Sequence, residues 1–182
     1  MRPALAAAAF LLLCACRTTT TNTNTKINKT PGLVLLLLQP LALTATTTAA
    51  QLQQEFDRPF PVLAPDHSGP DPRDFVAADP PRLQIAVDRD VFRLTSLNRP
   101  YVEDVYRWPF IQPHQAWLAI DSVSPNPSTQ TERTLARILS RLATQDPVAI
   151  YLPAADRMVP APPGLPQLLR SPRPIGLLFP EN

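Results

Sequence analysis

The sequence predicts a small α+β domain at residues 82–180, with one main helix on a mixed or antiparallel sheet. Three segments indicate this class. His114–Asp121 is a mostly apolar run bounded by prolines, which is typical of a strand. Thr129–Ala143 has the spacing of one helical face, carried by Leu135, Ile138, Leu139 and Leu142. Val148–Leu152 is a second apolar run, so we expect a strand–helix–strand unit at the core.

The flanks of this unit predict further short elements. Arg82–Val87 and Val91–Leu97 alternate in hydrophobicity and are joined by a short acidic turn, which favours a β-hairpin. Pro100–Trp108 has the apolar spacing of one or two helical turns. After a proline-rich link, Leu165–Arg170 reads as a short turn. Ile175–Phe179 reads as a last edge strand, because prolines precede it.

Helix capping is expected at the start of the main helix. Thr129 is followed three residues later by Glu132, which is the spacing of a capping box. Each side chain of such a pair can bond to the backbone amide of the other residue. We therefore expect the main helix to begin at Thr129.

The N-terminus resembles an export signal. Residues 1–16 contain one arginine, a short apolar run and two cysteines, Cys14 and Cys16. The end of this run resembles a bacterial lipobox, which predicts lipidation of Cys16 and tethering to a membrane surface. A cleaved signal with incidental cysteines is the alternative.

A second apolar segment, Gly32–Ala45, lies within residues 17–50, which we expect to be a low-complexity tether. Three interpretations of this segment remain open. It can belong to the tether of a lipoprotein, it can be the signal itself, with the true start downstream of Met1 and cleavage before Gln51, or it can be a short membrane anchor. Its length of about 14 residues fits the first two interpretations better than the third, because it is short for a membrane-spanning helix. All three place the rest of the chain outside the cytoplasm or on a membrane.

Residues 51–81 are expected to form a proline-rich arm, because a proline occurs about every four residues over most of this segment. His67 lies in the arm beside Asp66 and Asp71. A single imidazole in such a loop does not provide preorganised metal coordination, so we expect a solvated turn there.

Charge and cysteine content exclude several partner classes. Residues 1–50 carry four basic and no acidic side chains, whereas residues 51–182 carry 13 arginines and 15 acids, a net charge of 13 − 15 = −2. This balance argues against nucleic acid as a partner. Both cysteines precede residue 17, so neither disulfides nor thiolate metal sites are expected in the domain.

Three sets of side chains are considered as candidates for a functional site. His114 is the candidate general base, but strand alternation places it on the opposite face from Asp121. Glu103 and Asp104 are neighbours on the expected short helix and diverge by about 100°, which disfavours an acid–base pair.

Arg133, Arg137 and Arg141 recur every four residues opposite the apolar helix face. They form a possible anion-binding face toward lipid head groups or an acidic partner.

Parts of the chain resemble a known family. Asn98–Asp104, His114–Asp121, the leucine- and arginine-rich helix and Ile150–Pro153 are similar to the bacterial domain-of-unknown-function family 4261. The resemblance covers about residues 82–180. It implies an α+β domain and supplies neither an activity nor catalytic residues.

These observations favour an exported, non-catalytic binding or interaction module. The alternative is a secreted hydrolase that uses His114 with acids from elsewhere in the fold. No cofactor, metal site or catalytic residue is predicted, and the ligand or partner is left open.

Overall fold

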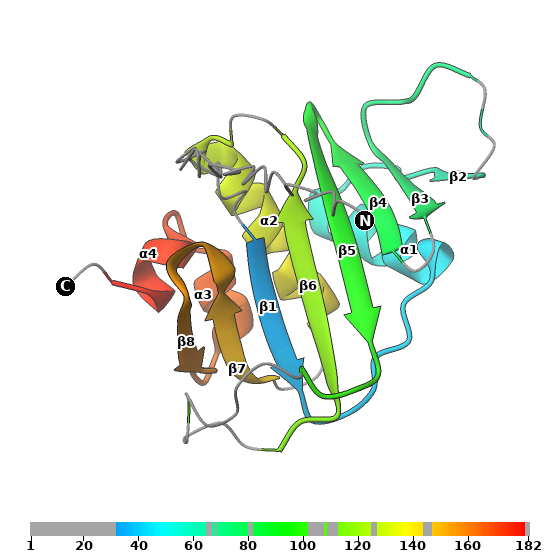
Figure 1. The fold of residues 1–182 in the computed structure, drawn as a ribbon. Helices are drawn as coiled ribbons and strands as arrows, with labels where there is room; N and C mark the ends of the chain where they lie inside the picture. Colours follow the sequence, from blue (N-terminus) through cyan, green and yellow to red (C-terminus); the bar gives the residue numbers. More distant parts are fainter. Residues whose placement is uncertain are drawn as a thin grey trace, which may run out of the picture.

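One eight-stranded sheet with helices on one face forms the architecture (Figure 1). The computed structural model describes residues 32–64, 67, 69–79, 82–101, 108, 113–124, 127–143 and 147–180. Its strands are β1 (Gly32–Leu37), β2 (Val62–Leu63), β3 (Phe75–Asp79), β4 (Arg82–Val87), β5 (Asp90–Leu97), β6 (Ala116–Ser122), β7 (Pro147–Leu152) and β8 (Arg157–Pro160). Its helices are α1 (Ala45–Phe56), α2 (Thr129–Leu142), α3 (Leu165–Leu169) and α4 (Pro174–Leu178), with a 3-10 turn η2 (Pro153–Ala155). The predicted α+β class with one main helix is confirmed.

The centre of the sheet is β1, the segment that the sequence suggested was part of a tether. The strand order is β2-β3-β4-β5-β6-β1-β7-β8, and β1 is antiparallel to both β6 and β7. All six of its residues are buried. The expected tether boundary at residue 50 is therefore wrong. A strand covered on both faces needs apolar residues at every position, so its sequence resembles a signal or a short span.

The predicted strand–helix–strand unit is confirmed, but with β1 inserted into it. Because β6 and β7 are both antiparallel to β1, they run parallel to each other, and α2 connects them. The predicted faces of β6 are also observed. Ala116, Leu118 and Ile120 are fully buried beneath the helices, and Trp117 lies on the opposite face.

The apolar face of α2 is buried as predicted, but its cap lies one residue earlier. Leu135, Leu139 and the other two predicted side chains of this face are fully buried. The N-cap is Ser128, whose hydroxyl accepts a hydrogen bond from the Thr131 amide at 3.1 Å. The Thr131 hydroxyl in turn accepts from the Ser128 amide. Threonine at the third position thus replaces the expected Glu132 in the capping box.

The β4–β5 hairpin is confirmed, whereas the proline-rich arm contains more structure than expected. Residues 45–56 form α1, which ends before Pro59, the first proline of that segment. Downstream, β3 joins the sheet, and the Val76 amide donates to the Pro61 carbonyl at 3.0 Å. The prolines from Pro59 to Pro72 thus all lie in the segment between α1 and β3.

The C-terminal segment corrects the expected edge strand. Residues 174–178 form α4, and Pro174 occupies a first-turn position where no backbone donor is required. The edge strand is instead β8, inside the expected proline-rich link, and α3 replaces the predicted short turn. The expected helix at 100–108, with Glu103 and Asp104, lies largely outside the described residues, as do Asp66 and residues 1–31.

Two clusters of buried side chains cover the two faces of the sheet. The larger one lies between the sheet and the four helices. The smaller one, on the opposite face, is built on Val34, Leu36, Ala149 and Met158. Tyr101, Trp108, Trp117 and Tyr151 pack on it with ring centroids 5.5–5.9 Å apart. The two tryptophans are therefore packing residues.

The position of β1 can be tested with two identical substitutions. Leu35 is fully buried in β1, whereas Leu38, just after the strand, is 44% exposed. Leu35→Ala should lower the free energy of unfolding by about 2–5 kcal/mol, since it leaves a cavity in the core. Leu38→Ala should change it by less than about 0.5 kcal/mol. Chemical denaturation of both variants measures the difference, and equal effects would contradict a central β1.

Candidate functional site

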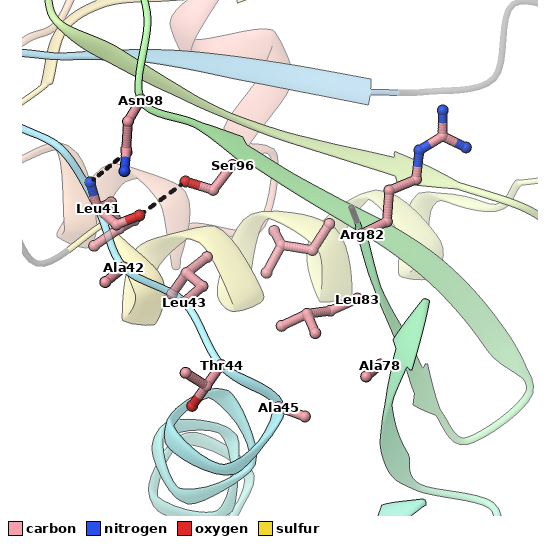
Figure 2. Close-up of a pocket in the computed structure, with 11 residues that line it drawn as sticks. Leu41, Ala42, Leu43, Thr44, Ala45, Ala78, Arg82, Leu83, Ser96 and Asn98 are labelled. Atoms are coloured by element: carbon pink, nitrogen blue, oxygen red, sulfur yellow. Dashed lines mark hydrogen bonds between the residues drawn. The ribbon is translucent and has the colours of Figure 1, made fainter. Parts of the chain in front are cut away.

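A pocket lies where the chain passes from β1 to α1, beside β4 and β5 (Figure 2). Its volume is about 500 Å³, which is within the usual range for small-molecule sites. The apolar part of its lining comes from Ala78 of β3, Leu83 of β4, Leu94 of β5 and the segment from Leu41 to Ala45, in which Thr44 adds a polar side chain. Ser96 and Asn98, at the end of β5, supply polar groups.

Two side chains fix the wall of the pocket in place. The Leu41 amide donates to Asn98 Oδ1 at 3.2 Å, and the Ser96 hydroxyl donates to the Leu41 carbonyl at 3.1 Å (Figure 2). Both polar groups of the Leu41 backbone are thereby satisfied by β5 and the residue that follows it. The next residues lead into α1, where Thr44 and Thr47 form a reciprocal capping box.

The described lining of the pocket includes one charged residue. Arg82 is the single ionisable residue in its described lining. Its side chain leaves the strand on the opposite face from Leu83, and its guanidinium points away from the pocket in Figure 2. The polar groups offered to a ligand are thus neutral. Together with the leucine and alanine walls, they suit binding better than acid–base or nucleophilic chemistry.

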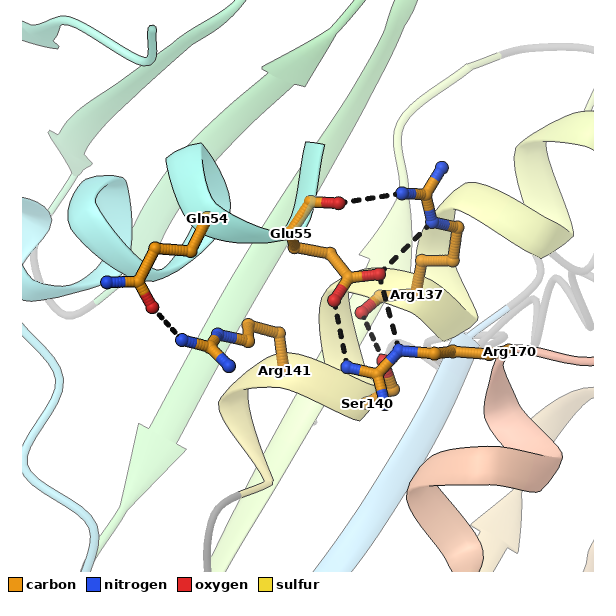
Figure 3. A network of polar contacts seen from close by, with 6 residues as sticks. All are labelled: Gln54, Glu55, Arg137, Ser140, Arg141 and Arg170. Atoms are coloured by element: carbon orange, nitrogen blue, oxygen red, sulfur yellow. Dashed lines mark hydrogen bonds and ion pairs between the residues drawn. The ribbon is translucent and has the colours of Figure 1, made fainter. Parts of the chain in front are cut away.

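The three arginines of α2 lie opposite its apolar face, as predicted, but each of them also contacts another part of the chain. All three are partly buried against other elements. Arg137 donates to the side chain of Glu55 at 3.2 Å and to its carbonyl at 2.8 Å, and its guanidinium lies 4.4 Å from the ring centroid of Phe56 (Figure 3). Arg133 donates to the Pro172 carbonyl, and Arg141 to the Gln54 side chain. The three side chains are therefore partly covered by other parts of the chain.

These contacts join three helices. Arg170, directly after α3, donates to the second carboxylate oxygen of Glu55 at 2.8 Å, so one carboxylate holds two guanidiniums (Figure 3). The Glu55 side chain is only 9% exposed. Anion binding by Arg133, Arg137 and Arg141 stays a prediction, and an anion would compete with these intramolecular partners.

The pKa of Glu55 is lowered from its ordinary value of 4.5. Burial alone would raise this pKa, but hydrogen bonds and charge from Arg170 and Arg137 outweigh it. A carboxylate whose pKa is depressed in the folded state stabilises the fold above its unfolded pKa. That stabilisation is lost as pH falls through the folded pKa, which here lies below 4.5.

His114 is held by the backbone. Its Nε2 accepts a hydrogen bond from the Tyr101 amide at 2.9 Å, and its side chain is partly buried. A general base needs a free lone pair on the nitrogen that takes the proton. In this geometry Nε2 has already used it, so the arrangement favours a packing role over the hydrolase alternative.

His67 and Asp71 also lack the geometry of a metal site. His67 Nε2 lies 3.9 Å from Asp71 Oδ1, too far for a hydrogen bond. Across the described ranges, no three His, Cys, Asp or Glu side chains gather as metal ligands would. Nor does that part of the chain contain a helix long and apolar enough to cross a membrane.

The pocket was missed by sequence reasoning because it depends on β1 being a strand. A local signal was present in Thr44 and Thr47, whose spacing suits the start of a helix, and in the apolar Leu41 and Leu43 before them. The pairing of Leu41 with Asn98 spans 57 residues and has no local signature.

Comparison of the chain with protein-family models, with curated proteins and with solved structures finds no match. The resemblance of residues 82–180 to family 4261 stays a prediction.

The Glu55–Arg137 contact gives a stability prediction. Arg137→Ala should lower the free energy of unfolding at pH 7 by about 1–2 kcal/mol, because it removes two hydrogen bonds to Glu55. The value is at the low end for charged groups, because the Arg137 side chain is 40% exposed. Denaturation curves at pH 7 and at a series of lower pH values measure it, and the part of the difference from wild type that depends on the Glu55 carboxylate should be lost as the pH falls through the folded pKa of Glu55.

Arg133→Ala is the matched control for Arg137→Ala. It removes the same side chain from the same helix face, but Arg133 donates one hydrogen bond to a backbone carbonyl and has no part in the Glu55 cluster. Its effect should be smaller and should not depend on the protonation of Glu55. Equal, pH-independent effects of the two substitutions would show that the cluster adds nothing to stability.

Proposed function

We propose that this protein is an exported, membrane-tethered module that binds a small ligand without transforming it. The observation that carries the proposal is the pocket beside the start of α1, with its volume of about 500 Å³ and a lining that combines leucine and alanine side chains with neutral polar groups. Pockets of this kind, with a few placed polar groups, are the usual sites for small molecules.

The neutral lining supports binding over catalysis. Ser96 is the obvious candidate nucleophile in the pocket, but its hydroxyl donates to the Leu41 carbonyl. Activation of a serine requires a base within hydrogen-bond reach. His114, the candidate base, accepts from the Tyr101 amide and is absent from the described lining of the pocket.

Tethering is compatible with this fold if processing occurs before β1. Cleavage before Gln51 would remove β1 and half of α1 together, and with them the centre of the sheet. Lipidation at Cys16 would leave residues 17–31 between the anchor and the first strand. Fully extended, that length spans at most roughly 50 Å. A tether of this reach allows the pocket to face away from a membrane surface.

Export and processing can be tested by intact mass. The protein isolated from its native host should have lost at least the first 15 residues and should retain Gly32 and everything after it. A lipid mass on Cys16 and partition into detergent would identify the anchored form. Recovery of Met1 on a soluble cytoplasmic protein would refute export, and a mature chain beginning at Gln51 would refute the retention of β1.

Ligand binding can be tested by filling the pocket. Ala78 lines it, so Ala78→Phe should abolish chemical-shift changes that a library of small apolar compounds causes at the amides of Leu43 and Leu83. A phenyl ring occupies the space that a ligand needs.

Ala77→Phe is the matched control. Ala77 is the neighbouring residue of β3, pairs with Gln84, and points to the opposite face of the sheet. This variant should bind the same compounds as wild type does. If no compound perturbs the pocket amides of wild type, or if both variants behave alike, the pocket is not the binding site.

A further inference from the structure

We infer that the pocket selects an uncharged aliphatic carboxamide, that is, an apolar chain ending in a neutral group with both a carbonyl and an N–H. This inference rests on the proposed function, because it names the ligand class of the same pocket. It follows from which atoms of Asn98 and Ser96 are already engaged and which are left for a ligand.

The orientation of the Asn98 amide is set by its partner. The Leu41 amide is a donor, so the atom that faces it at 3.2 Å must be the oxygen Oδ1. Nδ2 therefore points elsewhere, and it has no hydrogen-bond partner within the described residues. Asn98 thus offers two donor hydrogens to a ligand and no free carbonyl in that direction.

Ser96 offers the complementary group. Its hydroxyl hydrogen is directed to the Leu41 carbonyl at 3.1 Å, which leaves the oxygen lone pairs as acceptors. Ser96 and Asn98 are two residues apart at the end of β5, and both line the pocket. A ligand head group that accepts from Asn98 and donates to Ser96 satisfies both residues.

A carboxamide matches this pair better than a charged group of the same size does. A carboxylate has no hydrogen to donate to Ser96, and an ammonium group has no lone pair for Asn98. Neither charge would be neutralised, because the Arg82 guanidinium points away and no carboxylate is found in the described lining. Burying an unpaired charge beside Leu41, Leu83 and Leu94 is costly, whereas an alkyl chain gains from contact with them.

The test compares three probes that share one chain length: hexanamide, hexanoate and hexylammonium. Each is titrated into the full chain, labelled with ¹⁵N, at pH 7, and binding is followed at the amides of Leu43, Leu83 and Asn98. Hexanamide should bind about tenfold more tightly than either ion, which is the effect of about one hydrogen bond. This ranking is measured on wild type and needs no variant.

The substitution Asn98→Asp should change which of the three probes binds most tightly. The aspartate keeps an oxygen for the Leu41 amide, so the wall of the pocket is retained, but it replaces the two donor hydrogens by a negative acceptor. Hexanamide should weaken about tenfold and hexylammonium should become the tightest of the three probes. The control is Gln84→Glu, the same chemical change on the other face of the sheet, which should leave the ranking unchanged.

The outcomes separate this inference from the proposed function. If hexanoate or hexylammonium binds wild type as tightly as hexanamide does, the carboxamide class is refuted while the pocket remains a binding site. If Asn98→Asp folds and leaves the ranking unchanged, the role of Asn98 is refuted. If none of the probes perturbs the pocket amides, and the apolar compounds perturb none either, both the ligand class and the proposed function fail.

Discussion

The fold depends on the two hydrogen-bond ladders that β1 makes with β6 and β7. These two strands belong to one strand–helix–strand unit, yet they do not pair with each other, so only β1 closes the sheet between them. The side chains of Leu33, Leu35 and Leu37 enter the core beneath the helices, and those of Val34 and Leu36 enter the cluster on the opposite face. A strand that comes first in the described chain and lies at the centre of the sheet holds both layers together.

Local patterns predicted the elements that have one buried face. The β4–β5 hairpin and α2 alternate between apolar and polar positions with the period of their structure, which a sequence displays directly, whereas β6 was predicted from a mostly apolar run between prolines. The period vanishes in β1 because both of its faces are buried, and the remaining leucine run resembles an export signal. At the other end of the chain, Pro174 fits both an edge strand and the first turn of a helix. The structure contains the helix, and Leu178 and Phe179 at its end are buried against the core.

The arginines of α2 show a second limit of sequence reasoning. Their spacing correctly separates them from the leucine face, but it does not reveal what covers them. Arg137 is covered by Glu55 and Phe56 at the end of α1. Arg170, which follows Glu55 by 115 residues, binds the same Glu55 carboxylate. A polar stripe of this kind is typical of an outer face when one layer of helix covers the sheet. Here a second helix packs beside the first, and the stripe becomes the contact between them.

The candidate site is a consequence of the same central strand. After β1 the chain must return to the helical layer, and it does so over residues 38–44 along the end of β5. The backbone of Leu41 would be left with unsatisfied polar groups on this path, and Ser96 and Asn98 satisfy them. Each of these side chains bonds with one atom and leaves its other hydrogen-bonding capacity toward the pocket. The structural requirement of the connection thereby places a donor and an acceptor side by side next to the leucine side chains of the pocket, which is the arrangement that a neutral amide can use.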